Sequence, residues 1–158
     1  MRDVATGRLL RDLRGHSNGV TAAVLLSAAD SLDLAGRVPS LAGRPAESVR
    51  LAVTGSLDCC LKLWNVSDGA AAASIYTYGG ITAVAYAAAG RCCLVGHESG
   101  KLEAYTFCVD DGVPATHPLY SINAFDDAIS SIRVRHSEVK SVGSQSFWGS
   151  LPQKAALK

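Results

Sequence analysis

Residues 51–65 read LAVTGSLDCCLKLWN, and the fold class follows from how apolar and turn-forming residues alternate in this stretch. Two short apolar runs, 51–54 and 61–64, flank a Gly-Ser-Leu-Asp cluster at 55–58 that is typical of a turn. Alternation along the second run places its two leucines on one side and Trp64 on the other. The stretch therefore predicts two short β-strands joined by a turn.

The same pattern recurs on both sides of this stretch. Downstream, the runs 92–95 and 101–105 flank a second turn-like cluster, about 40 residues further along the chain. Upstream, residues 2–7 align without gaps with residues 64–69. Four short strands in roughly 40 to 45 residues is the period of a propeller blade, and no window shows sustained helical periodicity with caps. We therefore expect an all-β chain of consecutive four-stranded antiparallel blades.

Residues 28–48 interrupt this spacing. The interval between the first two aligned segments is longer by about 20 residues than a blade period, and the excess holds two prolines and two glycines between strand-like runs. We expect a surface insertion, which serves either as a second partner-contact loop or as a solvated linker.

Composition and charge exclude several classes of protein. Of the 158 residues, 48% are hydrophobic and 18% are charged, which is too apolar for a disordered chain. The net charge of +1 lacks the basic excess of a nucleic-acid binder, and no apolar run is long enough for a membrane helix. Five cysteines, with adjacent pairs at 59–60 and 92–93, make a poor disulfide framework. We expect a cytoplasmic protein, with the nucleus as the alternative, that binds neither nucleic acid nor membrane.

Gly15-His16, the segment 54–58 and the segment 61–65 together resemble a WD40 repeat. A blade of that family runs from a Gly-His loop to a Trp-Asp dipeptide, for which the Trp-Asn ending seen here is a common variant. The resemblance implies a hydrogen-bonded tetrad formed by His16, Thr54, Asp58 and Trp64. A buried indole N–H needs an acceptor, a hydroxyl can accept it and donate onward, and an imidazole can bridge that hydroxyl to a carboxylate. The tetrad is therefore expected to stabilise the blade, with no catalytic residue in it.

The next repeat departs from the family pattern. Gly79-Gly80 replaces the Gly-His pair, Val95 replaces the hydroxyl, Ser99 replaces the aspartate and Tyr105 replaces the tryptophan. We expect this blade to depend on packing and on backbone hydrogen bonds. His97, which is isolated in a turn position, is expected to be a solvated loop residue.

The resemblance also implies a division of the chain. Residues 1–144 are expected to form a partial WD40-type β-propeller, an open arc, and residues 145–158 an irregular C-terminal tail. The expected parts of the arc are an outer strand at 1–14, a blade at 15–77 that carries the insertion 28–48, a degenerate blade at 78–124 and a partial blade at 125–144.

The length bears on closure of the ring. A seven-bladed propeller needs roughly 280 residues, so this chain is expected to be a fragment or isoform of a larger WD-repeat protein. Its partners are then the remaining propeller blades of a parent chain and other proteins of a multiprotein complex. We expect the isolated chain to expose two apolar blade faces and to associate.

The function implied by the resemblance is that of a non-catalytic scaffold for protein–protein interaction. Rigid blades present variable loops at the rim of the ring, and such loops contact partners. The candidate contact residues are Ser17, Asn18, Tyr78, Asp126 and Asp127.

An alternative is a small hydrolase that uses His16 and Asp58, but the sequence lacks a G-x-S-x-G nucleophile elbow. A zinc site at the paired cysteines is disfavoured, because adjacent residues of a strand point to opposite faces and no C-x-x-C spacing occurs. We expect no cofactor and no bound metal.

Overall fold

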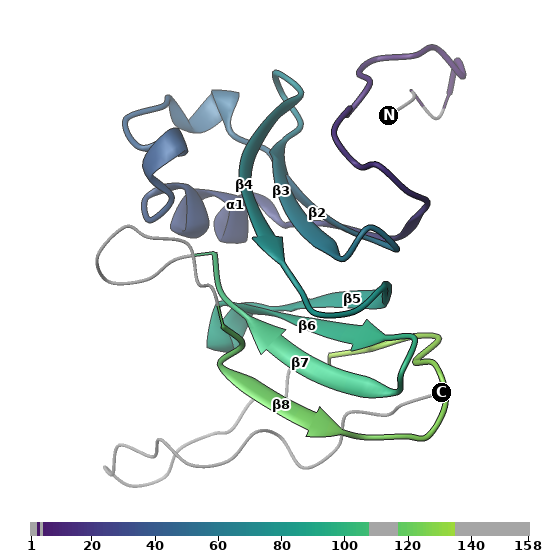
Figure 1. Cartoon of the computed structure of the whole chain (residues 1–158). Helices are drawn as coiled ribbons and strands as arrows, with labels where there is room; N and C mark the ends of the chain where they lie inside the picture. Colours follow the sequence, from purple (N-terminus) through teal and green to yellow (C-terminus); the bar gives the residue numbers. More distant parts are fainter. Residues whose placement is uncertain (1–2, 4, 108–116, 135–158) are drawn as a thin grey trace, which may run out of the picture.

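The computed structural model describes residues 3, 5–107 and 117–134, which form two four-stranded antiparallel sheets. In the first sheet the strands follow chain order: β1 (Val20–Leu25), β2 (Leu51–Ser56), β3 (Cys60–Asn65) and β4 (Ala70–Tyr76). The second sheet repeats this arrangement with β5 (Ile81–Ala87), β6 (Cys92–His97), β7 (Lys101–Tyr105) and β8 (Tyr120–Asn123). The two sheets stack as consecutive blades of an arc that does not close, so the expected fold class is confirmed (Figure 1).

The main core lies between the two sheets, because alternate residues of each inner strand point toward the neighbouring blade. The first sheet contributes Val53 and Leu63, which are cross-strand partners on β2 and β3. From the second sheet, Val95 and Tyr105 enter the same cluster. A smaller cluster covers the opposite face of the second sheet and comprises Ala83, Ala85, Leu102, Ile129 and Ile132.

Gly55 allows the two blades to approach closely. A Cβ atom at this position of β2 would overlap Ile81 Cγ2 and lie 2.7 Å from Val84 Cγ2, both on β5. Beside it, the hydroxyl of Thr21 on β1 lies 3.1 Å from the Gly55 carbonyl oxygen and 2.6 Å from that of Ile81. The junction therefore combines close backbone packing with a hydrogen bond between blades.

The far face of the second sheet repeats this junction. A Cβ atom at Gly96 would lie 2.7 Å from Cβ and from Cγ2 of Ile129. The Thr82 hydroxyl lies 3.1 Å from the Gly96 carbonyl oxygen and 2.7 Å from that of Ile129. Residue 129 thus stands in the same relation to the second blade as residue 81 does to the first.

The insertion is folded onto the core, so the solvated-linker interpretation was wrong. It contains the helix α1 (Ala28–Ala35) and two 3-10 turns, η1 (Pro39–Leu41) and η2 (Ala46–Ser48). The Ser27 hydroxyl caps α1 by accepting from the Asp30 amide. Leu34, Val38 and Leu41 are each at most 2% exposed. An eight-residue helix has too few turns for a convincing apolar period, which explains why it escaped the sequence analysis.

Two other predicted elements differ from the structure. The outer strand predicted at 1–14 does not form in residues 3 and 5–14, where Leu9 alone makes an isolated bridge. The partial blade predicted at 125–144 is described only to residue 134, and no strand forms in 125–134. A strand is stable only when it pairs along its length with another strand, and neither described segment belongs to either of the two sheets. The rest of that blade and the tail at 145–158 lie outside the described residues.

A third 3-10 turn, η3 (Ala88–Gly90), links β5 to β6. In the part of the chain that the structure describes, no helix is long and apolar enough to cross a membrane.

Gly55→Ala should lower the free energy of unfolding by about 1–3 kcal/mol, because the new methyl group would force β2 and β5 apart. The control is Gly19→Ala, where a Cβ would meet no atom within 4 Å and where the free energy should change by about 0.5 kcal/mol or less. Urea unfolding of both variants measures the difference. Equal stability of the two variants would contradict the close junction.

Candidate functional site

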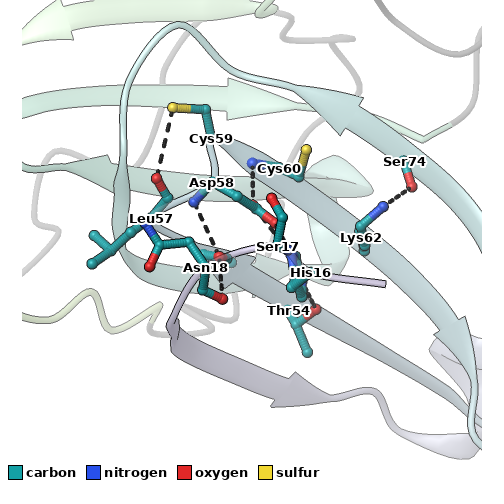
Figure 2. Close-up of polar contacts among 12 residues, drawn as sticks. His16, Ser17, Asn18, Thr54, Leu57, Asp58, Cys59, Cys60, Lys62 and Ser74 are labelled. Carbon is teal, nitrogen blue, oxygen red and sulfur yellow. Dashed lines mark hydrogen bonds and ion pairs between the residues drawn. The ribbon is translucent and has the colours of Figure 1, made fainter. Parts of the chain in front are cut away.

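His16, Thr54, Asp58 and Trp64 lie in one connected hydrogen-bond network. Trp64 Nε1 donates to Thr54 Oγ1 over 2.8 Å, and the same oxygen lies 2.7 Å from His16 Nε2. On the other side of the ring, His16 Nδ1 lies 2.9 Å from Asp58 Oδ2. Figure 2 shows the histidine between the hydroxyl of Thr54 and the carboxylate of Asp58.

Three parts of the first blade bring these side chains together. Thr54 and Trp64 come from the neighbouring strands β2 and β3, Asp58 from the turn between them, and His16 from the loop before β1. Gly15 lets this loop pass over the indole, since its φ of +149° disfavours other residues and a Cβ there would lie 3.3 Å from Trp64 Cη2. The network therefore attaches the loop to the first sheet.

The direction of each hydrogen bond follows from the groups involved. An ionised carboxylate only accepts, so His16 Nδ1 carries the proton that it shares with Asp58. The unprotonated Nε2 then accepts from the Thr54 hydroxyl, whose oxygen accepts from the indole. A neutral imidazole satisfies every polar atom along this path, so the network costs no unpaired buried group.

Asp58 receives two further hydrogen bonds, from the backbone amides of Ser17 at 2.8 Å and Cys60 at 2.9 Å (Figure 2). Burial raises the pKa of this carboxyl, but the Ser17 amide, the His16 ring and the Cys60 amide favour the charged form more strongly. The pKa is therefore lowered from 3.8 to about 2. Asp58 is ionised at neutral pH and connects the loop before β1 to the β2–β3 turn.

The same geometry bears on the hydrolase alternative. Asp58, His16 and Thr54 do form an acid–imidazole–hydroxyl series, the order found in nucleophilic hydrolases. However, Thr54 is only 9% exposed, and its oxygen already accepts from the Trp64 indole. No substrate could reach that hydroxyl without removal of the loop, so this arrangement supports a structural role.

The second blade replaces the tetrad with another buried polar cluster. Tyr105, the counterpart of Trp64, donates its hydroxyl to Glu103 Oε2 over 2.8 Å. Lys101 Nζ lies 2.7 Å from Glu103 Oε1, and His97 Nε2 lies 3.0 Å from Oε2. Glu103 and His97 are 1% and 2% exposed.

Two expectations for this blade were therefore wrong: His97 is buried, and the blade does not depend on packing and backbone hydrogen bonds alone. Val95 lies opposite Glu103 in the β6–β7 register. It replaces the hydroxyl residue of the family pattern, and its side chain has no hydroxyl to offer. Two features of the sequence could have indicated the cluster. Glu103 is a charged residue between apolar neighbours, and it shares a strand face with Tyr105.

The electrostatics of this cluster centre on Glu103. Burial raises the pKa of its carboxyl. Hydrogen bonds from Lys101 and Tyr105 and the charge of His97 lower the pKa by a larger amount, so it lies below its usual 4.5. Burial and the bond to Glu103 raise the pKa of the Tyr105 hydroxyl. The result is a buried carboxylate anion with a neutral phenol as donor.

The five candidate contact residues lie in three loops along one edge of the molecule. Ser17 and Asn18 precede β1, Tyr78 precedes β5, and Asp126 and Asp127 follow β8. Consecutive strands reverse direction within each sheet, so these loops lie with the β2–β3 and β6–β7 turns, at the right of Figure 1. All five residues are exposed, and we call this edge the loop rim.

Hydrogen bonds fix the ends of the rim loops. Asn18 accepts from Ser56 through its carbonyl oxygen, and Asp127 accepts the Ala128 amide through its carboxylate. The Thr77 amide, next to Tyr78, donates to the Cys59 carbonyl oxygen over 2.7 Å. The loops thus present exposed side chains on ordered backbone.

Of the described cysteines, Cys60, Cys92 and Cys93 lie in strands and Cys59 lies in the β2–β3 turn. Cys92 and Cys93 are buried, Cys59 and Cys60 are half-buried, and all four are free thiols. Burial raises the pKa of Cys93 strongly, so that thiol is a packing residue and not a nucleophile.

Comparison with known proteins identifies the fold. The chain matches no protein-family model, and no curated protein is significantly similar to it. Among solved structures, the WD40 repeats of RRP9 superpose with a TM-score of 0.55 at 20% identity, over 79% of this chain and 32% of that one. U3-55K gives 0.55 at 19% over the same shares, and the WD40 β-propeller domain of Doa1 gives 0.52 at 16%, over 78% and 34%.

The chain thus spans about a third of the length of the solved structures that it matches. At this level of identity the similarity concerns the fold, and the fold is a partial WD40 β-propeller. The resemblance inferred from the sequence is confirmed in that respect.

The lowered pKa of Asp58 predicts a pH dependence of stability. Since the pKa of the folded state, about 2, lies below the ordinary 3.8, the stabilisation is complete above about pH 4 and is lost as the pH falls toward 2. Urea unfolding between about pH 5 and pH 2 should show a steeper loss for the parent chain than for Asp58→Asn. The control is Asp12→Asn, at an exposed carboxylate paired with Arg14, whose profile should match the parent chain. Parallel profiles for all three would contradict the network.

Proposed function

We propose that this chain is an arc of a non-catalytic WD-repeat scaffold that binds other proteins through the loop rim. The observation that carries the proposal is the attachment of the first rim loop to the blade through Asp58, which bonds both His16 and the Ser17 amide. A loop whose backbone is fixed loses little conformational entropy when a partner binds. Ordered loops with exposed polar and aromatic tips therefore suit protein recognition.

The polar side chains of the first blade favour a scaffold over an enzyme. Every polar atom from Trp64 to Asp58 has a partner within the network, and the side chains of His16 and Asp58 are each 6% exposed. Catalysis requires groups that reach a substrate in an accessible site. We therefore assign this constellation to stability, and the alternative of a small hydrolase loses its nucleophile.

We also propose that the free faces of the arc bind further blades, as in a fragment or isoform of a larger WD-repeat protein within a multiprotein complex. Leu25 on β1 is 68% exposed and pairs with Ala52, so it shares the sheet face that carries Thr54 and points away from the second blade. At the other end of the arc, Tyr120 and Ile122 of the edge strand β8 are exposed. In a propeller, neighbouring blades cover such faces. We further propose that the assembly lies in the cytoplasm or the nucleus.

Charge reversal at the loop rim tests partner binding. Asp126→Lys with Asp127→Lys should reduce the amount of specifically captured protein about tenfold, because like charges repel a partner selected for this edge. Glu47→Lys, in the exposed part of the insertion, is the matched control and should leave capture unchanged. Affinity capture from cell extract with quantitative mass spectrometry gives the readout. Equal capture by all three proteins would contradict binding through the rim.

Self-association of the isolated chain tests the free face. Light scattering after size-exclusion chromatography should show concentration-dependent oligomers, because the exposed blade face lacks its neighbour. Leu25→Lys should shift the chain toward the monomer, whereas Leu32→Lys, at an exposed leucine of α1, should not. A monomer at every concentration would argue against an apolar face that awaits further blades.

A further inference from the structure

The first strands of the two sheets, β1 and β5, begin with the same local structure. In 20–22 and in 81–83 the register against the second strand of the sheet shifts by one residue, and the extra residue is a threonine in both. Each threonine hydroxyl bonds the carbonyl of a glycine on that second strand and a carbonyl of the segment that packs next to it. Such a bulge is a defined feature of a strand and aims the neighbouring side chains. Val20 is therefore the counterpart of Ile81.

The contact face of β5 is buried, whereas the matching face of β1 is exposed. Ile81 is 0% exposed and Val84 is 8% exposed, and both pack closely on Gly55 of the first blade. Their counterparts on β1 are Val20, which is 53% exposed, and Ala23, which is also exposed. Among the described glycines, none receives the methyl groups of Val20 as Gly55 receives those of Ile81. The start of β1 thus has the structure of a blade junction without the neighbouring blade.

A third apolar side chain extends this exposed surface. Leu25 is 68% exposed, whereas its counterpart Tyr86 is half-buried and packs against the main core. The cross-strand partners of the three β1 residues are alternate residues of β2, so the three side chains share one face of the sheet. We call this surface the β1 face, and it comprises Val20, Ala23 and Leu25.

The two junctions within the chain show what a neighbour of the β1 face must carry. Gly55 and Gly96 each occupy the next-to-last position of the second strand of their sheet. At both glycines, a Cβ atom would lie too close to an isoleucine of the next segment, so a larger residue would exclude that isoleucine. At both, a threonine hydroxyl bonds the carbonyl oxygen of the same isoleucine. Steric overlap with any other residue makes this contact selective for glycine.

We propose that the β1 face binds a WD-type blade of a partner protein, and that this blade carries glycine at the next-to-last position of its second strand and threonine or serine in the bulge of its first strand. Val20 enters the space that the glycine leaves, and the hydroxyl donates to the Val20 carbonyl oxygen. Because the same contact occurs twice along the arc and β1 repeats the start of β5, the β1 face continues an interface that the chain already contains. This inference rests on the proposed function, since it names the kind of blade that the free face takes.

A tandem chain supplies a blade with these contact residues. In it, residues 1–75 are followed directly by residues 15–158, so that an added first blade precedes the rest of the protein. The second Val20 then follows Ile75 of the added blade by six residues, as Ile81 follows Ile75 in the parent chain. Covalent linkage raises the effective concentration of the added blade, so that even a weak contact is formed.

Val20→Ala, made at the Val20 that follows the added blade, should raise the unfolding equilibrium constant of the tandem chain about tenfold, because a buried contact is lost. The same substitution should change that of the parent chain less than about twofold, because the side chain is exposed there. Urea unfolding, at concentrations at which light scattering shows monomers, gives both constants. The control is Leu32→Ala, at an exposed leucine of α1 outside the β1 face, which should affect the two chains equally.

Variants of the added blade test the selectivity for glycine. Gly55→Ala in the added blade should destabilise the tandem chain and remove most of the effect of Val20→Ala, because the new methyl group takes the space that Val20 needs. Gly19→Ala in the added blade is the matched control, since a Cβ there meets no atom within 4 Å, and it should leave the effect of Val20→Ala unchanged.

Three outcomes would overturn the proposal: equal effects of Val20→Ala in the tandem and parent chains, equal behaviour of Gly55→Ala and Gly19→Ala in the added blade, or an added blade that unfolds independently of the rest. If Val20→Ala is silent in the tandem chain while Leu25→Lys still shifts the parent chain toward the monomer, this inference falls and the scaffold with a free face stands. If Val20→Ala acts as expected while the rim variants retain their captured proteins, binding through the loop rim falls instead.

Discussion

The indole N–H of Trp64 is buried inside the first blade, and the local structure depends on how that proton is accepted. A Thr54 hydroxyl alone would accept it but would leave its own proton unused. His16 accepts a hydrogen bond from that hydroxyl at Nε2 and donates another from Nδ1 to Asp58, which also accepts from the loop backbone at Ser17. One donor that must be satisfied thus fixes a turn, two strands and the loop before β1 relative to one another. The rim loop before β1 owes its order to this chain of bonds.

The second blade meets the same constraint with other chemistry. Tyr105 occupies the position of Trp64, and its hydroxyl needs an acceptor that Val95 cannot supply. Glu103 provides one, but a buried carboxylate needs additional donors, which Lys101 and Ser121 deliver. Unlike His16, His97 has one nitrogen without a hydrogen bond in the described structure. The blade that departs most from the family pattern therefore still supplies its buried aromatic hydroxyl with an acceptor.

Contacts between blades depend on a different feature, the close approach of a neighbouring segment to a glycine backbone. Gly55 leaves space for Ile81 of the second blade, and Gly96 leaves space for Ile129 in the segment after β8. A threonine beside each glycine bonds both backbones. Because this device occurs at both junctions, the arc has a repeated geometry even though the two polar clusters differ. The polar clusters can differ while the junctions stay the same, because the two features lie on opposite faces of the second strand of each sheet, β2 or β6.

The sequence alone determined the strand alternation and the turn at Asp58, because both depend on short-range spacing. The existence of two meander sheets follows from the same signals. The first tetrad followed from the resemblance to a WD40 repeat, since His16 lies 38 residues before Thr54 in the chain. Only the tertiary structure decided that α1 packs against the core, that residues 3 and 5–14 do not form a strand, and that His97 is buried beside Glu103. These features depend on which distant segments come together and on whether a partner strand lies alongside. Local spacing carries no information on either point.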